Sequence, residues 1–304
     1  MRTLALALTA PVVLMLGLGA LSCSKKTRDV GDGFEADGGG QFVAETGPTV
    51  KPLASCADDN KDVFVIAEDR TFYSFHPPTL EFKTKGLLDC PTGGATPTSM
   101  AVDRNGIAWV RHSDNSVWRV STETLACEQT KYQPQPGGAF TKFGMGFATE
   151  TKGGSTEALY LSDSTGQGLA KLNTATLALD LIGPYTGELA GMTSELTGTG
   201  DGKLYGFFVT SPAQIAEISK ATGDVISAKP LPGVFAGNAW AFSFYGGDFF
   251  VYTNAEGSLP KDGGGSDVTK YSPADGSVTV VKTKIGFKIV GAGVSTCAPT
   301  TSPR

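Results

Sequence analysis

Apolar and polar positions alternate in short runs along most of the chain, and one eight-residue arrangement recurs five times. Each copy has an apolar first residue, four or five turn-forming residues and an apolar last residue. The middle residues are Thr, Ser, Asp, Pro and Gly, which favour a β-hairpin turn. The copies are 75–82, 120–127, 172–179, 218–225 and 271–278. Their starts lie 45, 52, 46 and 53 residues apart, a spacing typical of β-propeller blades.

Further strand-like segments precede each hairpin. In the second repeat, Met100–Val102 and Ile107–Val110 flank the turn sequence Asp103–Gly106, and Val117–Val120 follows a second turn. Each repeat therefore predicts four short antiparallel strands. No segment between residues 55 and 296 shows sustained helical periodicity.

The first strand of each repeat carries a second pattern, in which positions one and three are small. The five aligned segments are 99–102, 144–147, 191–194, 239–242 and 291–294. Successive side chains of a strand point to opposite faces. We therefore expect the small positions to line the axis where blades converge, and the larger alternate residues to pack between blades.

The last copy predicts how the ring closes. Residues 291–295 form a first strand with no second, third or fourth strand after it, whereas residues 63–90 hold the last three strands without a first. The C-terminal strand is therefore expected to complete the opening blade. The prediction is an all-β fold: a β-propeller of five four-stranded blades over residues 55–298, followed by a disordered tail at 299–304.

The N-terminal segment has the pattern of a bacterial secretion signal. Arg2 precedes an apolar run over residues 4–21, and Ala20-Leu21-Ser22-Cys23 resembles the lipobox of bacterial lipoproteins, although that pattern usually has Leu where Ala20 stands. The resemblance implies a signal peptide at 1–22 and a lipid on Cys23. The alternative is an uncleaved membrane helix, because the run is just long enough to span a bilayer.

Residues 23–54 are rich in glycine and poor in large apolar residues, which predicts a flexible tether. Ser24 after the cysteine resembles lipoproteins that are sorted to an outer membrane. The expected location is therefore the cell envelope, with the domain attached to the outer membrane on its periplasmic or surface face. The membrane, reached through the lipid on Cys23, is the first expected partner.

The five cysteines fit this interpretation. If Cys23 carries lipid, four remain, and four cysteines allow three connectivities. We favour Cys56–Cys297 and Cys90–Cys127. The first pair would lock the closure of the ring and add about 4–5 kcal/mol in the entropic model. The second is less direct, because the expected strand directions place Cys90 and Cys127 near different faces.

Charge excludes one class of partner. The chain of 304 residues has a formal net charge of −5 and an isoelectric point near 5.2. A nucleic-acid-binding protein needs a basic footprint, which this composition lacks.

The segment 97–110 resembles the strand repeats of NHL, SMP-30/gluconolactonase and streptogramin-lyase propellers. This likeness covers fourteen residues and implies blade structure more than activity. The whole domain also resembles β-propeller lipoproteins of Gram-negative bacteria, at Gly144–Phe147, Glu195–Gly202 and Gly291–Cys297. That second likeness implies no particular reaction. Enzymatic members of the first group use either a divalent metal at the channel mouth or a catalytic histidine.

Extending the inner-strand alignment by one position yields the best polar group in the sequence. The residues are Asp103, Glu195, Ser243 and Ser295, with Ala148 in the remaining repeat. If they converge at one channel end, they could bind a cation or a small cationic ligand, since oxygen ligands suit Ca²⁺ or Mg²⁺. They could equally face water.

The histidines and tryptophans are weaker candidates for a functional site. The two histidines, His76 and His112, fall in or beside turns and are expected at the surface, away from the axis. Core packing is the favoured role of Trp109, Trp118 and Trp240, with sugar stacking as the alternative.

The leading hypothesis is a non-enzymatic, lipid-anchored propeller that acts as an envelope binding or scaffold module for a protein or small-molecule partner. No cofactor is assigned, and calcium is the candidate ion. The rival is an envelope hydrolase or lyase with a metal-assisted site at Asp103 and Glu195. A third hypothesis is a purely structural surface protein.

Overall fold

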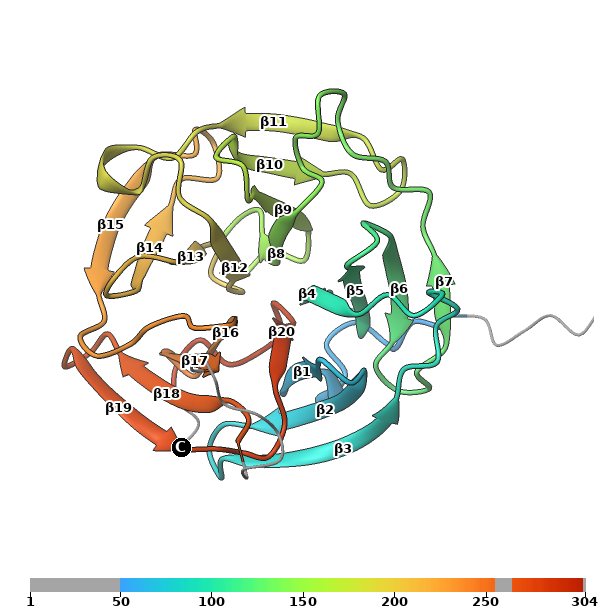
Figure 1. Cartoon of the computed structure of the whole chain (residues 1–304), viewed down its shortest axis with the longest axis horizontal. Coiled ribbons are helices and arrows are strands. Elements are labelled where there is room, and N and C mark those ends of the chain that lie inside the picture. The colour runs from blue at the N-terminus through green and yellow to red at the C-terminus, as the bar shows by residue number, and fades with distance from the viewer. Residues whose placement is uncertain (1–49, 255–263, 303–304) are drawn as a thin grey trace, which may run out of the picture. The chain divides into compact units, whose positions relative to one another are not determined.

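A ring of five four-stranded antiparallel sheets makes up the domain (Figure 1). The computed structural model describes residues 50–254 and 264–302. The predicted five-bladed β-propeller is therefore confirmed. The expected signal peptide, Cys23 and the tether up to residue 49 lie outside the described residues.

Each blade runs from an inner strand at the centre to an outer strand at the rim (Figure 1). Blade 1 contains β20 (Ile289–Val294), β1 (Val63–Ala67), β2 (Thr71–His76) and β3 (Glu81–Leu87). Blade 2 contains β4 (Pro97–Val102), β5 (Ile107–His112), β6 (Val117–Ser121) and β7 (Cys127–Gln129). Blade 3 contains β8 (Phe143–Thr149), β9 (Glu157–Asp163), β10 (Gly168–Leu172) and β11 (Leu179–Gly183).

Blade 4 contains β12 (Ser194–Gly198), β13 (Leu204–Phe208), β14 (Gln214–Ile218) and β15 (Val225–Pro230). Blade 5 contains β16 (Ala239–Tyr245), β17 (Asp248–Asn254), β18 (Asp267–Ser272) and β19 (Ser277–Lys282). Two short 3-10 helices, η1 (Asp58–Asn60) and η2 (Gly187–Leu189), lie in connections. No helix in the described part of the chain is long and apolar enough to cross a membrane.

The inner strands run in the same direction, which gives the ring two different faces. We call the face where the inner strands begin the entry face and the face where they end the exit face. The connections from one blade to the next lie on the entry face. The hairpin turns between first and second strands lie on the exit face.

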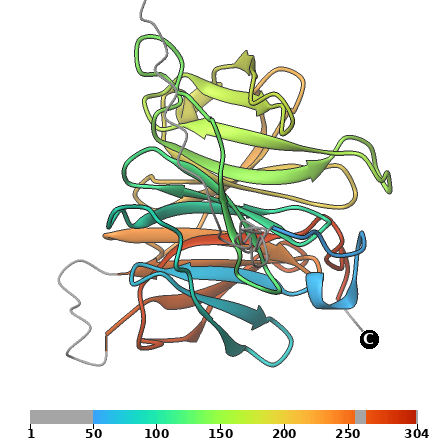
Figure 2. The ribbon, with the colours of Figure 1, turned by 90° about the vertical axis from the view of Figure 1, so that its right-hand side faces the viewer.

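The two ends of the domain meet in blade 1. Strand β20 pairs with β1 in antiparallel register, from Val63 opposite Val294 to Ala67 opposite Ile289. Cys56 and Cys297 form a disulfide beside this pairing, on the exit face. Figure 2 shows the segment before β1, in blue, beside the red segment that follows β20. The predicted closure and its disulfide are both confirmed.

Tight contacts between neighbouring inner strands explain the small residues of the sequence repeat. A Cβ atom on Gly144 would lie 2.3 Å from the carbonyl oxygen of Ser194, and one on Gly293 would lie 2.8 Å from the backbone nitrogen of Val102. Side chains at these positions would push adjacent blades apart. The small positions therefore face the next blade, and the expectation that they line an open axis is wrong.

One segment of the inner-strand alignment is also wrong. Residues 191–194 were expected to be the first strand of blade 4, whereas β12 begins at Ser194. Gly191 has a φ of 74°, a left-handed conformation that a strand does not contain, and it closely follows η2. The small-residue pattern at 191–193 thus belongs to the connection. The close approach to blade 3 is made by Gly198, where a Cβ would lie 2.2 Å from the carbonyl oxygen of Phe147.

Apolar side chains fill the spaces between blades. The cluster between blades 2 and 3, for example, joins Trp109 to Met145 and Leu161, all of them almost completely buried. Five such clusters are present among the described residues. Each blade therefore has both faces covered, and the alternate residues of an inner strand face one neighbouring blade or the other.

The second disulfide, Cys90–Cys127, is confirmed, although the two cysteines were expected near different faces. Strands twist steadily across a sheet, so the outer strand of a blade crosses its inner strand at a large angle. The end of β3 consequently reaches the third turn of blade 2. A Cβ on Gly86 would lie 2.8 Å from a methyl carbon of Leu125, which shows how closely the two segments pack.

The start of the C-terminal tail is held on the domain. Pro299, the first residue of the expected disordered tail, accepts a 2.7 Å hydrogen bond from the backbone nitrogen of Gly246, in the turn between β16 and β17.

Replacing both Cys56 and Cys297 with Ser should lower the free energy of unfolding by about 5 kcal/mol, because this bond closes almost the whole domain. The two cysteines are 241 residues apart. The matched control is the double Ser variant of Cys90 and Cys127, which are 37 residues apart and for which the same model gives about 4 kcal/mol. Urea unfolding measures both. A smaller loss for the Cys56–Cys297 variant than for the control would show that this disulfide does not secure the closure.

Candidate functional site

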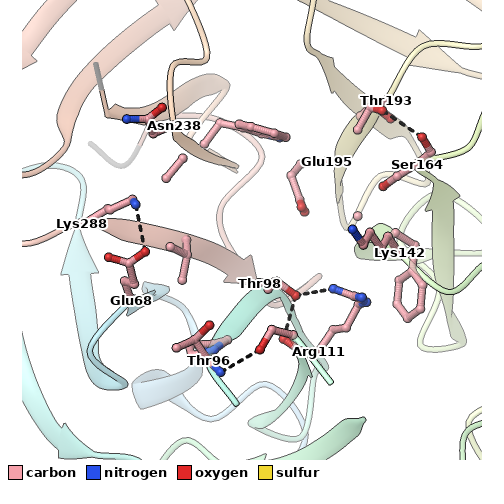
Figure 3. Close-up of a pocket in the computed structure, with 18 residues that line it drawn as sticks. Glu68, Thr96, Thr98, Arg111, Lys142, Ser164, Thr193, Glu195, Asn238 and Lys288 are labelled. Carbon is pink, nitrogen blue, oxygen red and sulfur yellow. Dashed lines mark hydrogen bonds and ion pairs between the residues drawn. The ribbon is translucent and has the colours of Figure 1, made fainter. Parts of the chain in front are cut away.

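A cavity of about 510 Å³ lies at the entry face, where the five inner strands begin. This volume falls within the range of small-molecule sites. Every blade contributes to its wall, as the side chains in Figure 3 show. The lining residues are Glu68, Thr96, Pro97, Thr98, Arg111, Ser113, Lys142, Phe143, Gly144, Ser164, Thr193, Ser194, Glu195, Asn238, Ala239, Trp240, Lys288 and Val290.

Glu195 is the most perturbed titratable group of the cavity. It is the second residue of β12, and only 8 % of its surface is exposed. Ser99 on β4, across the centre, donates a 2.9 Å hydrogen bond to its Oε2 atom. Burial raises the pKa of the carboxyl to about 8, against the opposing effects of hydrogen bonds from Ser99 and the Met145 backbone and of the Arg111 charge. Glu195 is therefore mainly protonated at neutral pH.

Arg111, from β5, is buried beside the cavity with 3 % of its surface exposed. Its Nε atom donates to the carbonyl oxygen of Thr141 at 2.9 Å. Its two terminal nitrogens donate to Thr98 Oγ1 at 2.5 Å and Asn115 Oδ1 at 2.7 Å. The guanidinium also lies 5.6 Å from the centre of the Phe143 ring. These contacts hold the group rigidly, and all three hydrogen-bond acceptors are neutral.

The rim carries further polar groups. Lys288 Nζ and Glu68 Oε1 form an ion pair at 2.9 Å on the blade 1 side of the opening (Figure 3). Lys142 reaches toward the opening from the connection before β8, and Asn238 stands on the opposite side (Figure 3). Trp240 is partly exposed and lines the wall, so the favoured core-packing role describes only part of its surface.

Two of the four predicted site residues lie on the exit face instead. Asp103 follows the last residue of β4, and its Oδ1 accepts hydrogen bonds from the backbone nitrogens of Asn105 at 2.8 Å and Ile107 at 2.9 Å. It therefore holds a hairpin turn together. Ser295 follows the last residue of β20 and accepts a 3.2 Å hydrogen bond from the Cys297 nitrogen. Neither residue lines the cavity.

Ser243, the fourth predicted residue, is fully buried between blades 5 and 1. Its hydroxyl lies 3.1 Å from the Tyr252 hydroxyl, and Tyr252 belongs to the apolar cluster that joins these blades. Of the four residues, only Glu195 lines the cavity. The expected convergence required position five of every strand to face the axis, but that position faces a neighbouring blade.

Sequence reasoning missed a carboxylate that closes the exit end. Glu157, at the start of β9, accepts hydrogen bonds from the Arg104 backbone nitrogen at 2.7 Å and from the Thr296 hydroxyl at 2.6 Å. A Cβ on Gly200 would lie 2.4 Å from the Thr296 carbonyl oxygen, so the C-terminal segment fills this end of the axis. A lone glutamate at the start of a strand has no motif that would reveal such a role.

The histidines do not join the cavity. His76 Nδ1 lies 2.8 Å from Asp62 Oδ1 on a partly exposed surface. His112 was expected at the surface, but only 1 % of it is exposed, and burial lowers its pKa to about 4. It ends β5, and its ring packs edge-on against Trp118 inside blade 2. The described residues contain no cluster of three or more His, Cys, Asp or Glu side chains that could hold a metal ion.

Comparisons with known proteins find distant structural similarities. No protein-family model matches the chain, and no curated protein matches it. Similar solved structures include a chain of a nidogen/laminin complex, with a TM-score of 0.47 and 10 % identity over 76 % of this chain and 97 % of that one. A protein from Bacteroides thetaiotaomicron has a TM-score of 0.46 and 16 % identity over 76 % and 57 % of the two chains. Regucalcin, a calcium-binding protein from Agrobacterium tumefaciens, has a TM-score of 0.41 and 12 % identity over 67 % and 68 %.

Replacing Glu195 with Gln should flatten the dependence of stability on pH. Because the pKa is raised from 4.5 to about 8, the folded chain keeps a proton that the unfolded chain releases. The contribution of this proton to the free energy of unfolding is complete below the pKa of the unfolded chain. It is lost as pH rises toward about 8, at up to about 1.4 kcal/mol per pH unit. Thermal unfolding between about pH 5 and pH 8 measures the difference.

The control for this experiment is Glu188→Gln, the same substitution at an exposed position of η2. The melting temperature of the wild-type chain and of this control should fall in parallel over the pH range, and that of Glu195→Gln should fall less. Parallel behaviour of all three proteins would show that Glu195 does not carry the proton.

Proposed function

We propose that this chain is a lipid-anchored β-propeller of the cell envelope that binds a small ligand in its central cavity. The observation that carries the proposal is the cavity itself, where polar groups from all five blades surround one space. Small-molecule sites combine a concave wall with a few placed polar groups, and this cavity has both. A binding role needs no assembled catalytic group.

The position of the N-terminal segment supports an anchor on the side opposite the cavity. The chain reaches the domain on the exit face, where the nitrogens of Leu53 and Cys56 each donate a 2.8 Å hydrogen bond to the carbonyl oxygens of Asn105 and Arg104. A lipid on Cys23 would therefore attach to the exit face through residues 24–49.

The two disulfides support the proposal that the protein is exported. Both disulfides join cysteines far apart in the sequence, and such bonds persist in oxidising compartments outside the cytosol. An envelope location is consistent with these bonds and with the lipobox-like sequence around Cys23.

A second candidate function is that of an envelope hydrolase or lyase, and Glu195 is the observation that favours it. A buried carboxyl with a pKa near 8 in a cavity is suited to general acid–base catalysis at neutral pH. Asp103, the expected second carboxylate, lies at the other end of the axis. Any such reaction would therefore rest on Glu195 with Ser99 and Arg111.

Replacing Cys23 with Ser should leave the chain at its uncleaved length, because the serine hydroxyl does not accept the thioether-linked lipid and cleavage before residue 23 follows lipidation. Incorporation of labelled palmitate, expected for the wild-type chain, should disappear. Ser22→Ala is the control and should keep the label and the membrane location. A wild-type chain that incorporates no palmitate and keeps its apolar N-terminal segment would rule out the lipid anchor and favour the uncleaved helix.

Replacing Thr193 with Trp should block ligand binding, because Thr193 lines the cavity and the indole would occupy its space. Chains isolated from envelope extracts would be analysed for retained small molecules by mass spectrometry. We expect the wild-type chain to retain at least about ten times more ligand than Thr193→Trp, which corresponds to about 1.4 kcal/mol.

The matched control is Thr174→Trp, an exposed position in the turn between β10 and β11 on the exit face, which should bind like the wild type. Equal retention by wild type and Thr193→Trp would exclude the cavity as the site. Retention by none of the three would favour a purely structural role. Recovery of a chemically altered molecule would favour the hydrolase or lyase.

A further inference from the structure

Arg111 is a buried cation that forms no ion pair with an acidic side chain in the described part of the chain. Its hydrogen bonds go to a carbonyl, a hydroxyl and an amide oxygen. Buried charges in proteins are normally paired, because an uncompensated charge in a medium of low polarity is costly. The acidic group that most affects Arg111 is Glu195, whose own burial favours the neutral form. The positive charge is therefore left without full compensation.

The other charged side chains around the cavity add to the positive charge of Arg111. Three cationic and two acidic side chains line the wall, and one pair, Lys288 with Glu68, neutralises itself. Lys142 has no ion-pair partner within residues 50–254 and 264–302. The cavity therefore carries one positive charge in excess when Glu195 is ionised and two when it is protonated. The chain as a whole has a net charge of −5, so this excess is local.

The uncharged groups of the cavity wall also favour an anionic ligand. Hydroxyls from blades 2, 3 and 4 line the cavity, and those of Thr96, Ser113 and Ser164 are able to donate hydrogen bonds to a ligand that is rich in acceptors. Trp240 and Phe143 supply apolar surface beside these donors. A metal cation would meet Arg111 and Lys142 at close range and be repelled by both.

We propose that the cavity binds a small organic carboxylate, with the carboxylate between Arg111 and Lys142 and the remainder of the molecule against Trp240. This inference rests on the proposed function, since it names the class of ligand for the same cavity. The carboxylate would supply the negative charge that Arg111 lacks. A guanidinium already fixed by Thr98, Asn115 and Thr141 needs no rearrangement to receive it.

The test compares two probes that differ in charge, cyclohexanecarboxylate and its neutral relative cyclohexanecarboxamide. Trp240 is the one partly exposed tryptophan, because Trp109 and Trp118 are 2 % and 4 % exposed. Its fluorescence therefore reports on the cavity, and Trp240→Phe provides the background signal. We expect the carboxylate to bind the full chain with a Kd at least about tenfold lower than that of the amide.

Lys142→Met is the variant of choice, because Lys142 is exposed and makes no structural ion pair, whereas Arg111 holds three neighbouring groups in place. It should weaken carboxylate binding by about tenfold and leave amide binding unchanged. Lys152→Met makes the same chemical change at an exposed position in the turn between β8 and β9, on the exit face. This control should bind both probes like the wild type.

Collisional quenching of Trp240 tests the charge of the cavity without any assumed ligand. Iodide should quench the fluorescence several times more strongly than caesium, once each quenching constant is divided by that for free N-acetyltryptophanamide, because a cationic cavity concentrates anions. Lys142→Met should reduce this ratio, and Lys152→Met should leave it unchanged. Equal normalised quenching by iodide and caesium in the wild type would contradict the proposal.

The outcomes separate the ligand class from the proposed function. If the amide binds as well as the carboxylate, or if inorganic phosphate competes with the carboxylate at a lower concentration, the cavity is a binding site but the carboxylate proposal is wrong. If neither probe changes Trp240 fluorescence while Thr193→Trp still abolishes retention of an envelope ligand, the proposed function stands and the carboxylate class falls. If that retention is also absent, both fall.

Discussion

The close approach of five inner strands around one axis is the constraint on which the rest of the structure depends. Gly144, Gly198 and Gly293 allow backbones of neighbouring blades to come within a distance that any Cβ would prevent. The ring still needs a closing contact, and the pairing of β20 with β1 supplies it. Because the strand that closes the ring comes from the far end of the chain, the first blade is complete only when the whole domain has folded.

This way of closing the ring makes the two ends of the axis chemically different. At the exit end, the segments before β1 and after β20 meet, and Glu157 accepts hydrogen bonds from both the Arg104 turn and Thr296. Backbone therefore occupies this end. At the entry end, the connections lead from the rim to the inner strands, and the space among the first residues of these strands remains as a cavity. The position of the candidate site thus follows from the end of the axis at which the ring is closed.

The repeat spacing, the blade count, the closure and the Cys56–Cys297 pairing were predictable, because each depends on local patterns that recur or on a strand that is visibly missing. The site was not. Glu195 was grouped with residues that lie at the exit end, although it lies at the entry end. The alignment began the first strand of blade 4 at residue 191, three residues before β12 begins, and so placed Glu195 at the wrong end of that strand. Arg111 and Lys142 carry no motif, and their proximity depends on the three-dimensional arrangement of blades 2 and 3.

The charge of the cavity shows why composition alone misleads about ligands. The chain has a net charge of −5, and the polar group that includes Glu195 was considered as a site for a cation or a small cationic ligand. Interaction between charges weakens with distance and with the screening of solvent, so a ligand in a buried site responds mainly to the groups that line it. Within the described residues, these are a guanidinium with neutral partners, an ammonium that forms no ion pair, the Lys288–Glu68 pair and a carboxyl whose pKa burial raises to about 8. The field inside the cavity is therefore opposite in sign to the net charge of the chain, and it selects for anions.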